Sequence, residues 1–95
     1  MQEDNLLKTV IESHQVEVKD SDFRSAVNIM LYKLRSKVAE NNQRIIIKME
    51  ATSFVLNSKE PVAVGGKLLS AFNKDKEKYL YKATITVEVK YLEMQ

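Results

Sequence analysis

The sequence predicts a small α+β domain with the element order β-α-β-β, in which one helix packs on a twisted, mainly antiparallel sheet. Three segments alternate between apolar and polar residues with the period of a β-strand, and one segment without glycine or proline repeats its apolar residues with the period of a helix. The 95 residues suffice for a single domain with one modest core. A hydrophobic fraction of 44% and a charged fraction of 29% are typical of a globular chain.

The composition excludes several classes of site and partner. The chain has no cysteine, so it holds no disulfide, no thiolate zinc site and no thiol nucleophile. Its net charge is +2, with 15 basic residues interleaved among 13 acidic ones, which gives no reason to expect nucleic acid as a partner. The acidic start and the lack of a long apolar run predict a cytoplasmic protein without an export signal or a membrane span. We expect no cofactor and no metal.

The first strand is predicted over Thr9–Lys19, after eight residues that are expected to be frayed. One of its sides carries Val10, Glu12, His14, Val16 and Val18. Because both sides mix apolar and polar residues, we expect each side to be only partly buried.

The helix is predicted from Phe23 to about Asn41. Asp20 or Ser21 is the expected N-cap, because a short oxygen-bearing side chain there accepts a hydrogen bond from a free backbone N–H of the first turn. The apolar stripe of the helix comprises Phe23, Ala26, Val27, Met30, Leu34 and Val38.

The second and third strands are predicted over Arg44–Leu56 and Lys78–Leu92. The second has apolar residues on both sides, with one side formed by Ile45, Ile47, Met49, Ala51, Ser53 and Val55. The third has a continuous core-type side formed by Tyr79, Tyr81, Ala83, Ile85, Val87, Val89 and Tyr91, and a largely solvated opposite side. A helix between the first two strands favours a right-handed crossover, and the last strand is expected to return antiparallel between them.

Residues 57–77 form an insert between the second and third strands. A structureless connection of this length is unusual inside a compact domain, so we expect a short additional strand at about 67–72 that pairs with the chain from Tyr79 onward. A helix of one or two turns is the alternative. Gly65-Gly66-Lys67 lacks the first glycine and the Ser or Thr of a phosphate-binding loop, and we interpret it as a turn.

The lengths of the elements predict self-association. The last strand spans about 50 Å and the helix only about 30 Å. One helix therefore cannot shield the whole apolar face of that strand unless the sheet curls tightly around it, and the helix itself carries apolar residues outside its stripe. We predict oligomer or partner contacts at Ile29, Leu31, Tyr32, Leu68, Leu69, Phe72, Tyr79 and Tyr81.

No group of residues has the pattern of a catalytic site. His14 is the only histidine, and Glu12 lies beside it on the same side of the strand. We interpret His14 as an edge-strand or interface residue, because a catalytic base would need partners from elsewhere in the fold.

The strand carboxylates and tyrosines also have a structural interpretation. The carboxylates Glu12, Glu50 and Glu88 have lysines nearby and are expected to form cross-strand ion pairs on a solvated face. The strand tyrosines Tyr79, Tyr81 and Tyr91 share a side with β-branched residues and are expected in the core or a subunit interface rather than in a stacking platform.

The layout resembles dodecin, a small flavin-binding family whose strands wrap one helix and whose copies assemble into a hollow shell. The resemblance lies in a strand like Lys8–Ser13, a helix opening like Ser21–Val27 and a last strand like Tyr81–Val87. Dodecin stacks flavin on a tryptophan of its second strand. This chain has no tryptophan and has Ile45 or Ile46 near that place, so the resemblance does not imply flavin binding.

A second resemblance includes the insert. The runs Ile46–Glu50 and Lys67–Phe72, followed by a charged turn and a valine-rich last strand, are similar to those of a small uncharacterised bacterial family. Its genes lie beside those for transport and for sugar-acid or amino-acid catabolism, which implies an accessory role. Together these observations predict a non-enzymatic, self-assembling module that is accessory to a bacterial transport or catabolic system. The alternative is a binding module for an aromatic small molecule, held between subunits near Tyr79 or Tyr81.

Overall fold

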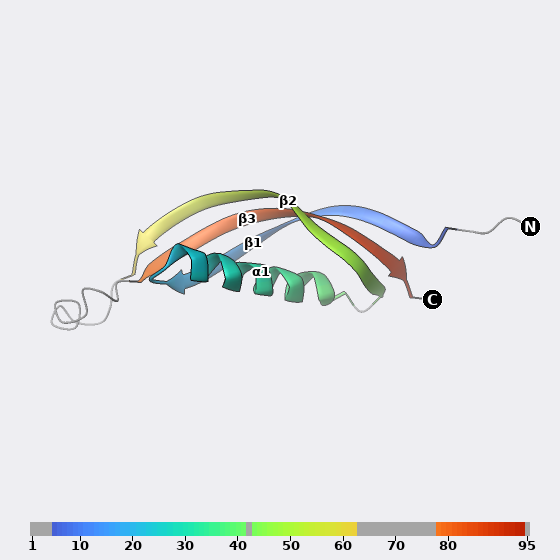
Figure 1. The fold of residues 1–95 in the computed structure, drawn as a ribbon, viewed down its shortest axis with the longest axis horizontal. Helices are drawn as coiled ribbons and strands as arrows, with labels where there is room; N and C mark the ends of the chain where they lie inside the picture. The colour runs from blue at the N-terminus through green and yellow to red at the C-terminus, as the bar shows by residue number, and fades with distance from the viewer. Residues whose placement is uncertain (1–4, 42, 63–77, 95) are drawn as a thin grey trace, which may run out of the picture.

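The computed structural model describes residues 5–41, 43–62 and 78–94. The described elements are β1 (Leu7–Asp20), α1 (Phe23–Ala39), β2 (Arg44–Pro61) and β3 (Tyr79–Glu93), as Figure 1 shows. The predicted α+β class is confirmed. The additional strand expected at about 67–72 lies outside the described residues.

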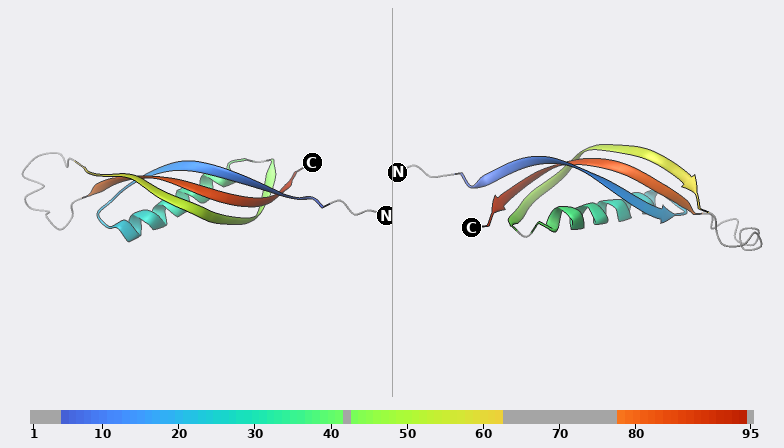
Figure 2. Two further views of the ribbon diagram at one scale, coloured as in Figure 1. Left: turned by 90° about the horizontal axis from the view of Figure 1, so that it is seen from above. Right: turned by 180° about the vertical axis from the view of Figure 1, so that it is seen from behind.

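The three strands form one sheet in the order β1-β3-β2. The central strand β3 pairs antiparallel with both neighbours, so β1 and β2 run in the same direction on either side of it. The sheet arches over α1, which lies along its concave side (Figure 1) and crosses the strands obliquely (Figure 2). The helix approaches the sheet most closely along β1. Because β3 contributes buried residues to the core and β2 contributes none, β2 is the strand that the helix covers least.

The core lies between α1 and the concave face of the sheet, which we call the inner face. Alternate residues of β3 point into it, and none of those from Tyr81 to Val89 exposes more than 1% of its surface. The full buried set is Val16 and Val18 from β1, Ala26, Met30, Leu34 and Val38 from α1, and Tyr81, Ala83, Ile85, Val87 and Val89 from β3. The predicted core side of the last strand is therefore the observed one. The predicted helix stripe is observed at Ala26, Met30, Leu34 and Val38, whereas Phe23 is 47% exposed and Val27 is only partly buried.

Helix α1 shields the buried stretch of β3. Tyr81 to Val89 spans about 26 Å of strand, and the 17 residues of α1 span about 25 Å. Because the sheet curls around the helix, the excess of apolar surface expected on the inner face of β3 is not found. The flanking Tyr79 and Tyr91 are partly buried, with the cations of Lys59 and Arg44 lying 4.4 and 5.3 Å from the centres of their rings.

Two predicted boundaries at the start of the chain need correction. Leu7 and Lys8 are part of β1 rather than frayed, because β3 is long enough to pair with both. The N-cap of α1 is Asp22 rather than Asp20 or Ser21, and its carboxylate accepts a hydrogen bond from Ser25 N at 3.2 Å. The Asp20 carboxylate instead accepts from Asp22 N and so supports the cap from the preceding turn.

The second strand differs most from the prediction. It continues through Pro61, so the first five residues assigned to the insert belong to β2. Its register with β3 shifts at three β-bulges, where Ile47, Thr52 and Asn57 are each left without a partner. Each extra residue reverses the alternation of faces, which is why the predicted grouping of Ile45 with the other odd-numbered residues is wrong.

The residues of β2 that share the inner face follow from the register. They are opposite the buried residues of β3 and comprise Met49, Ala51, Phe54, Leu56 and Lys59. The outer, convex face of β2 carries Ile45, Lys48, Glu50, Ser53, Val55, Ser58 and Glu60. From residue 50 to residue 57 every residue of β2 is exposed, whichever face it occupies. Among the described residues, no helix is long and apolar enough to cross a membrane.

Candidate functional site

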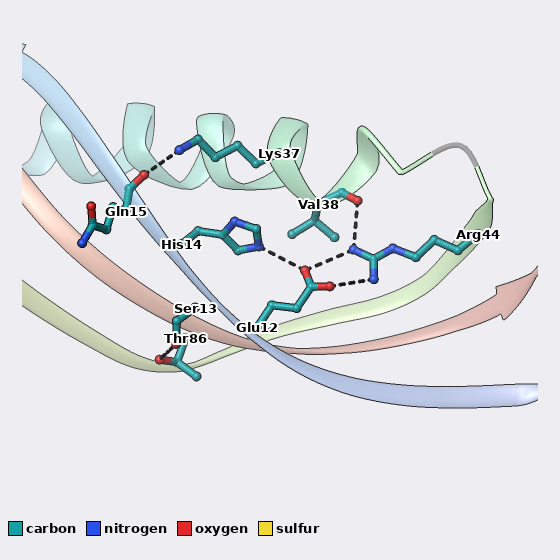
Figure 3. A network of polar contacts seen from close by, with 8 residues as sticks. All are labelled: Glu12, Ser13, His14, Gln15, Lys37, Val38, Arg44 and Thr86. Atoms are coloured by element: carbon teal, nitrogen blue, oxygen red, sulfur yellow. Dashed lines mark hydrogen bonds and ion pairs between the residues drawn. The ribbon is translucent and has the colours of Figure 1, made fainter.

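Three charged or titratable side chains form a network at the end of the helix (Figure 3). Glu12 and His14 extend from the inner face of β1, and Arg44 opens β2. Arg44 donates two hydrogen bonds to the Glu12 carboxylate, from Nη1 to Oε2 at 2.7 Å and from Nη2 to Oε1 at 3.1 Å. His14 Nε2 lies 3.0 Å from the same Oε1. The pairing of Glu12 with His14 agrees with their predicted shared side, whereas no pattern in the sequence distinguished Arg44 as their partner.

Arg44 also connects the network to the end of α1. Its Nη2 donates to the carbonyl oxygen of Val38 at 3.1 Å, one of the last-turn carbonyls that have no partner within the helix. Its guanidinium lies over the ring of Tyr91, and only 7% of the side chain is exposed. The network therefore joins β1, β2, β3 and the C-terminus of the helix through one cation.

The electrostatics fix the charge of the carboxylate. The hydrogen bonds from Arg44 lower the pKa of Glu12 below its usual range, and the bond to His14 adds to this effect although partial burial opposes it. An ionised Glu12 only accepts, so the imidazole Nε2 of His14 is the donor, which leaves Nδ1 as the acceptor in the neutral ring.

The chemistry available to this network is limited. A histidine oriented by a carboxylate is half of a nucleophile-activating arrangement, but no contact in the described part of the chain joins His14 to a hydroxyl or amine nucleophile. No group of three potential metal-ligating side chains occurs in residues 5–41, 43–62 and 78–94. The bidentate pair and the bond to Val38 instead explain why the helix end and two strands stay in place.

The other strand carboxylates are divided between the two faces. Glu50 and Glu88 lie directly opposite each other on the outer face, whereas Glu12 is on the inner face. Glu50 pairs along its own strand with Lys48 at 3.6 Å. A cross-strand ion pair does occur between Glu17 and Lys82, at 4.0 Å. The predicted cross-strand pairing with lysines on a solvated face is therefore wrong for Glu12 and Glu50, because Glu12 binds Arg44 on the inner face and Glu50 pairs within its own strand.

The tyrosines are already engaged within the chain. Tyr81 is buried, and its ring packs against Phe23 at 5.6 Å and Tyr79 at 6.2 Å between centroids. Lys59 lies over both tyrosines. The ring of Tyr81 therefore offers no surface to a second copy or to a stacking ligand in this conformation.

The remaining predicted contact residues differ in exposure. Tyr32 exposes 69% of its surface and Ile29 exposes 39%, so both are accessible on α1. Leu31 is partly buried and packs against the core. The predicted contacts Leu68, Leu69 and Phe72 lie outside the described residues, as does the Gly65-Gly66-Lys67 turn.

The largest concentration of exposed apolar residues lies on β2. Five residues, which we call the β2 surface, each expose between 37% and 55%: Ile45, Ile47, Phe54, Val55 and Leu56. The alternating apolar residues of Arg44–Leu56 were visible in the sequence, but their exposure depends on the position of α1 on the other side of the sheet. The β2 surface is thus a candidate contact region that the predicted set omitted.

Comparison with known protein families, with characterised proteins and with solved structures finds no match to this chain. The resemblances to dodecin and to the small bacterial family therefore stay predictions.

Proposed function

We propose that this chain is a self-associating module without a catalytic activity of its own, and that its copies meet through the β2 surface. The observation that carries the proposal is the concentration of exposed apolar residues on the strand that the helix of the same chain covers least. Exposed apolar residues scattered singly need no explanation, but Phe54, Val55 and Leu56 follow one another, and Ile45 and Ile47 lie further along the same strand. Such a concentration on one strand is typical of an interaction site.

The area of the β2 surface suits an interface of standard size. A large side chain presents on the order of 200 Å² when free, so five residues at about half exposure present roughly 450 Å². One side of a standard interface buries about 800 Å², of which about 57% is apolar, which also gives about 450 Å². The β2 surface can therefore supply the apolar part of one such interface.

The Glu12–His14–Arg44 network supports a structural module more than an enzyme. Its strongest contacts are internal to the fold, and they hold β2 against the helix end at the start of the same strand that carries the exposed surface. An accessory role in transport or catabolism stays a prediction from the resemblance.

The experiment is a measurement of mass over a range of micromolar concentrations by native mass spectrometry and light scattering. We expect a multiple of the 10.9 kDa chain mass. Val55→Lys, which places a charge in the β2 surface, is expected to shift the mass toward 10.9 kDa because an unpaired charge is costly to desolvate.

A matched control is Ile11→Lys. Ile11 is more exposed than Val55 and lies on the outer face of β1, opposite Glu88, so the new lysine is tolerated by the fold and should leave the mass unchanged. A wild-type protein that stays at 10.9 kDa throughout, or equal effects of the two substitutions, would contradict the proposal.

A further inference from the structure

The two edges of the sheet are not equivalent. Along β1, Lys33 Nζ donates to the carbonyl oxygen of Glu17 at 2.8 Å and Lys37 Nζ donates to that of Gln15 at 2.6 Å. The lysines of the helix thereby bind backbone carbonyl oxygens of β1 that another strand would need for pairing. Among the described residues, no side chain makes such a bond to the backbone of β2, so β2 is the edge open to another strand.

The exposed apolar residues of β2 lie on both faces of the sheet. Phe54 and Leu56 are on the inner face, and Ile45 and Val55 are on the outer face. A partner that docked on one face would leave the other exposed. A strand added beside β2 contacts both faces, because its side chains alternate in the same way.

The backbone of Phe54 is directed toward this open edge. The carbonyl oxygen of Thr86 accepts a bond from Thr52 Oγ1 at 3.3 Å, so the backbone groups of Thr86 point toward β2. Ser53 is the register partner of Thr86, and Val55 is that of Thr84, so Ser53 and Val55 use their backbone groups to bind β3. Phe54 lies between them and directs its N–H and C=O outward.

We propose that a second copy of this chain pairs its β2 antiparallel with the β2 of the first, around a two-fold axis at Phe54. The inference rests on the proposed function and adds the register of the contact. The two Phe54 residues then form a backbone hydrogen-bonded pair. Lys48 of each copy lies opposite Glu60 of the other, and both side chains are on the outer face, so opposite charges meet twice.

The bulges of β2 are compatible with this register. A bulge on an edge strand ordinarily discourages pairing, because it moves the next residues out of step with an added strand. Here the extra residue Thr52 lies between Phe54 and Lys48, and the extra residue Asn57 lies between Phe54 and Glu60. In the antiparallel arrangement, Thr52 of one copy and Asn57 of the other lie between the axis and the same charge pair. Each strand therefore has one extra residue in this interval, so Lys48 and Glu60 remain opposite each other and on the same face.

A charge exchange tests the Lys48–Glu60 contacts. Lys48→Glu and Glu60→Lys each replace two attractions by two repulsions, and each is expected to raise the dissociation constant roughly tenfold at low ionic strength. The double variant recreates the pairs with reversed sign and is expected to restore wild-type association. Sedimentation velocity measures the dissociation constants, and the differences of the two single variants from wild type should shrink in high salt.

Cross-linking tests the position of the axis. Because the chain has no native cysteine, an introduced cysteine can form a disulfide only with its counterpart in another copy. In the proposed register, the Cα atoms of the two Phe54 residues are about 5.5 Å apart, within the range of a disulfide. Phe54→Cys should therefore form a covalent dimer on mild oxidation. Leu56→Cys is the matched control, with similar exposure on the same face, but its two copies are about 13 Å apart and should stay unlinked.

The outcomes separate the two levels of the proposal. If Val55→Lys loses association but the charge-exchanged double variant is not rescued, the register is wrong and self-association through β2 is retained. Equal cross-linking at residues 54 and 56 leads to the same conclusion. A monomer under all conditions overturns both. Rescue together with cross-linking confined to residue 54 supports both.

Discussion

Removal of either partner of the Glu12–Arg44 pair is expected to destabilise the fold by about 2–3 kcal/mol. Loss of one member of a fully buried pair costs about 3–5 kcal/mol, and the 24% exposure of the Glu12 side chain reduces that cost through solvent screening. Because about 1 kcal/mol shifts the melting temperature of a domain of this size by about 4–8 °C, Arg44→Met should lower it by roughly 10–20 °C.

A double-mutant cycle isolates the interaction. Glu12→Gln leaves the nearly buried guanidinium of Arg44 without its counter-charge, and Arg44→Met leaves the carboxylate without its donor. The double variant has no unpaired charge, so its loss should be smaller than the sum of the single losses by about 1–2 kcal/mol. Denaturant unfolding followed by circular dichroism, at one protein concentration for all variants, gives the four stabilities. Strictly additive losses would show that the pair contributes nothing to the fold.

The same cycle has a dependence on pH with a defined sign. The pKa of Glu12 is lowered in the folded state from an ordinary value of 4.5, so its stabilisation is complete above that pH. It is lost as the pH falls from 4.5 through the lowered folded-state value. The difference in stability between wild type and Glu12→Gln should therefore be constant near neutral pH and shrink in acid. A difference that grew on acidification would refute the assignment of an ionised Glu12.

Three further changes test other parts of the fold. Leu34→Ala removes a fully buried side chain beneath β3 and should cost about 3 kcal/mol, measured as a lower denaturation midpoint, whereas a cost below about 1 kcal/mol would contradict its place in the core. Asp22→Ala removes the N-cap of α1 and should lower the melting temperature by a few degrees, with Asp22→Asn close to wild type. The double variant Lys33→Gln/Lys37→Gln opens the edge of β1 and should increase light scattering on storage, and unchanged scattering would argue against edge protection by these lysines.

The parts of the fold that local pattern determines were predictable. The alternation in β3 places Ile85 and Val87 in the core because a central strand under a helix has one fully covered face, and a period of two leaves no other choice for its apolar side. The stripe that includes Met30 and Leu34 is decided in the same way by the helical period. The acidic cluster before Phe23 identified the start of the helix, and only the choice among three adjacent oxygen-bearing side chains needed the structure.

The parts that depend on long-range register were not predictable. The contact of Arg44 with Glu12 joins residues 32 positions apart, and nothing in the local sequence of either distinguishes them from a surface pair. The bulges of β2 likewise leave no clear signal, since Ile47, Thr52 and Asn57 are ordinary strand residues, yet each one reverses the faces of everything that follows. A missed extra residue therefore exchanges the inner and outer faces of a whole strand segment.

The mismatch between strand and helix lengths still accounts for the exposed apolar surface, although that surface lies on β2 and not on β3 as expected. A sheet of long strands that curls over a 17-residue helix must bury its central strand first, because both neighbours and the helix converge on it. With α1 lying toward β1, the apolar residues that the helix cannot reach collect on β2, at the opposite edge. An exposed apolar strand at an open edge is the arrangement that a second strand satisfies most directly, because it supplies backbone partners and neighbouring side chains on both faces at once. The bulges at Thr52 and Asn57 lie on either side of Phe54. The irregularities of β2 within one copy are therefore also compatible with the pairing of two copies.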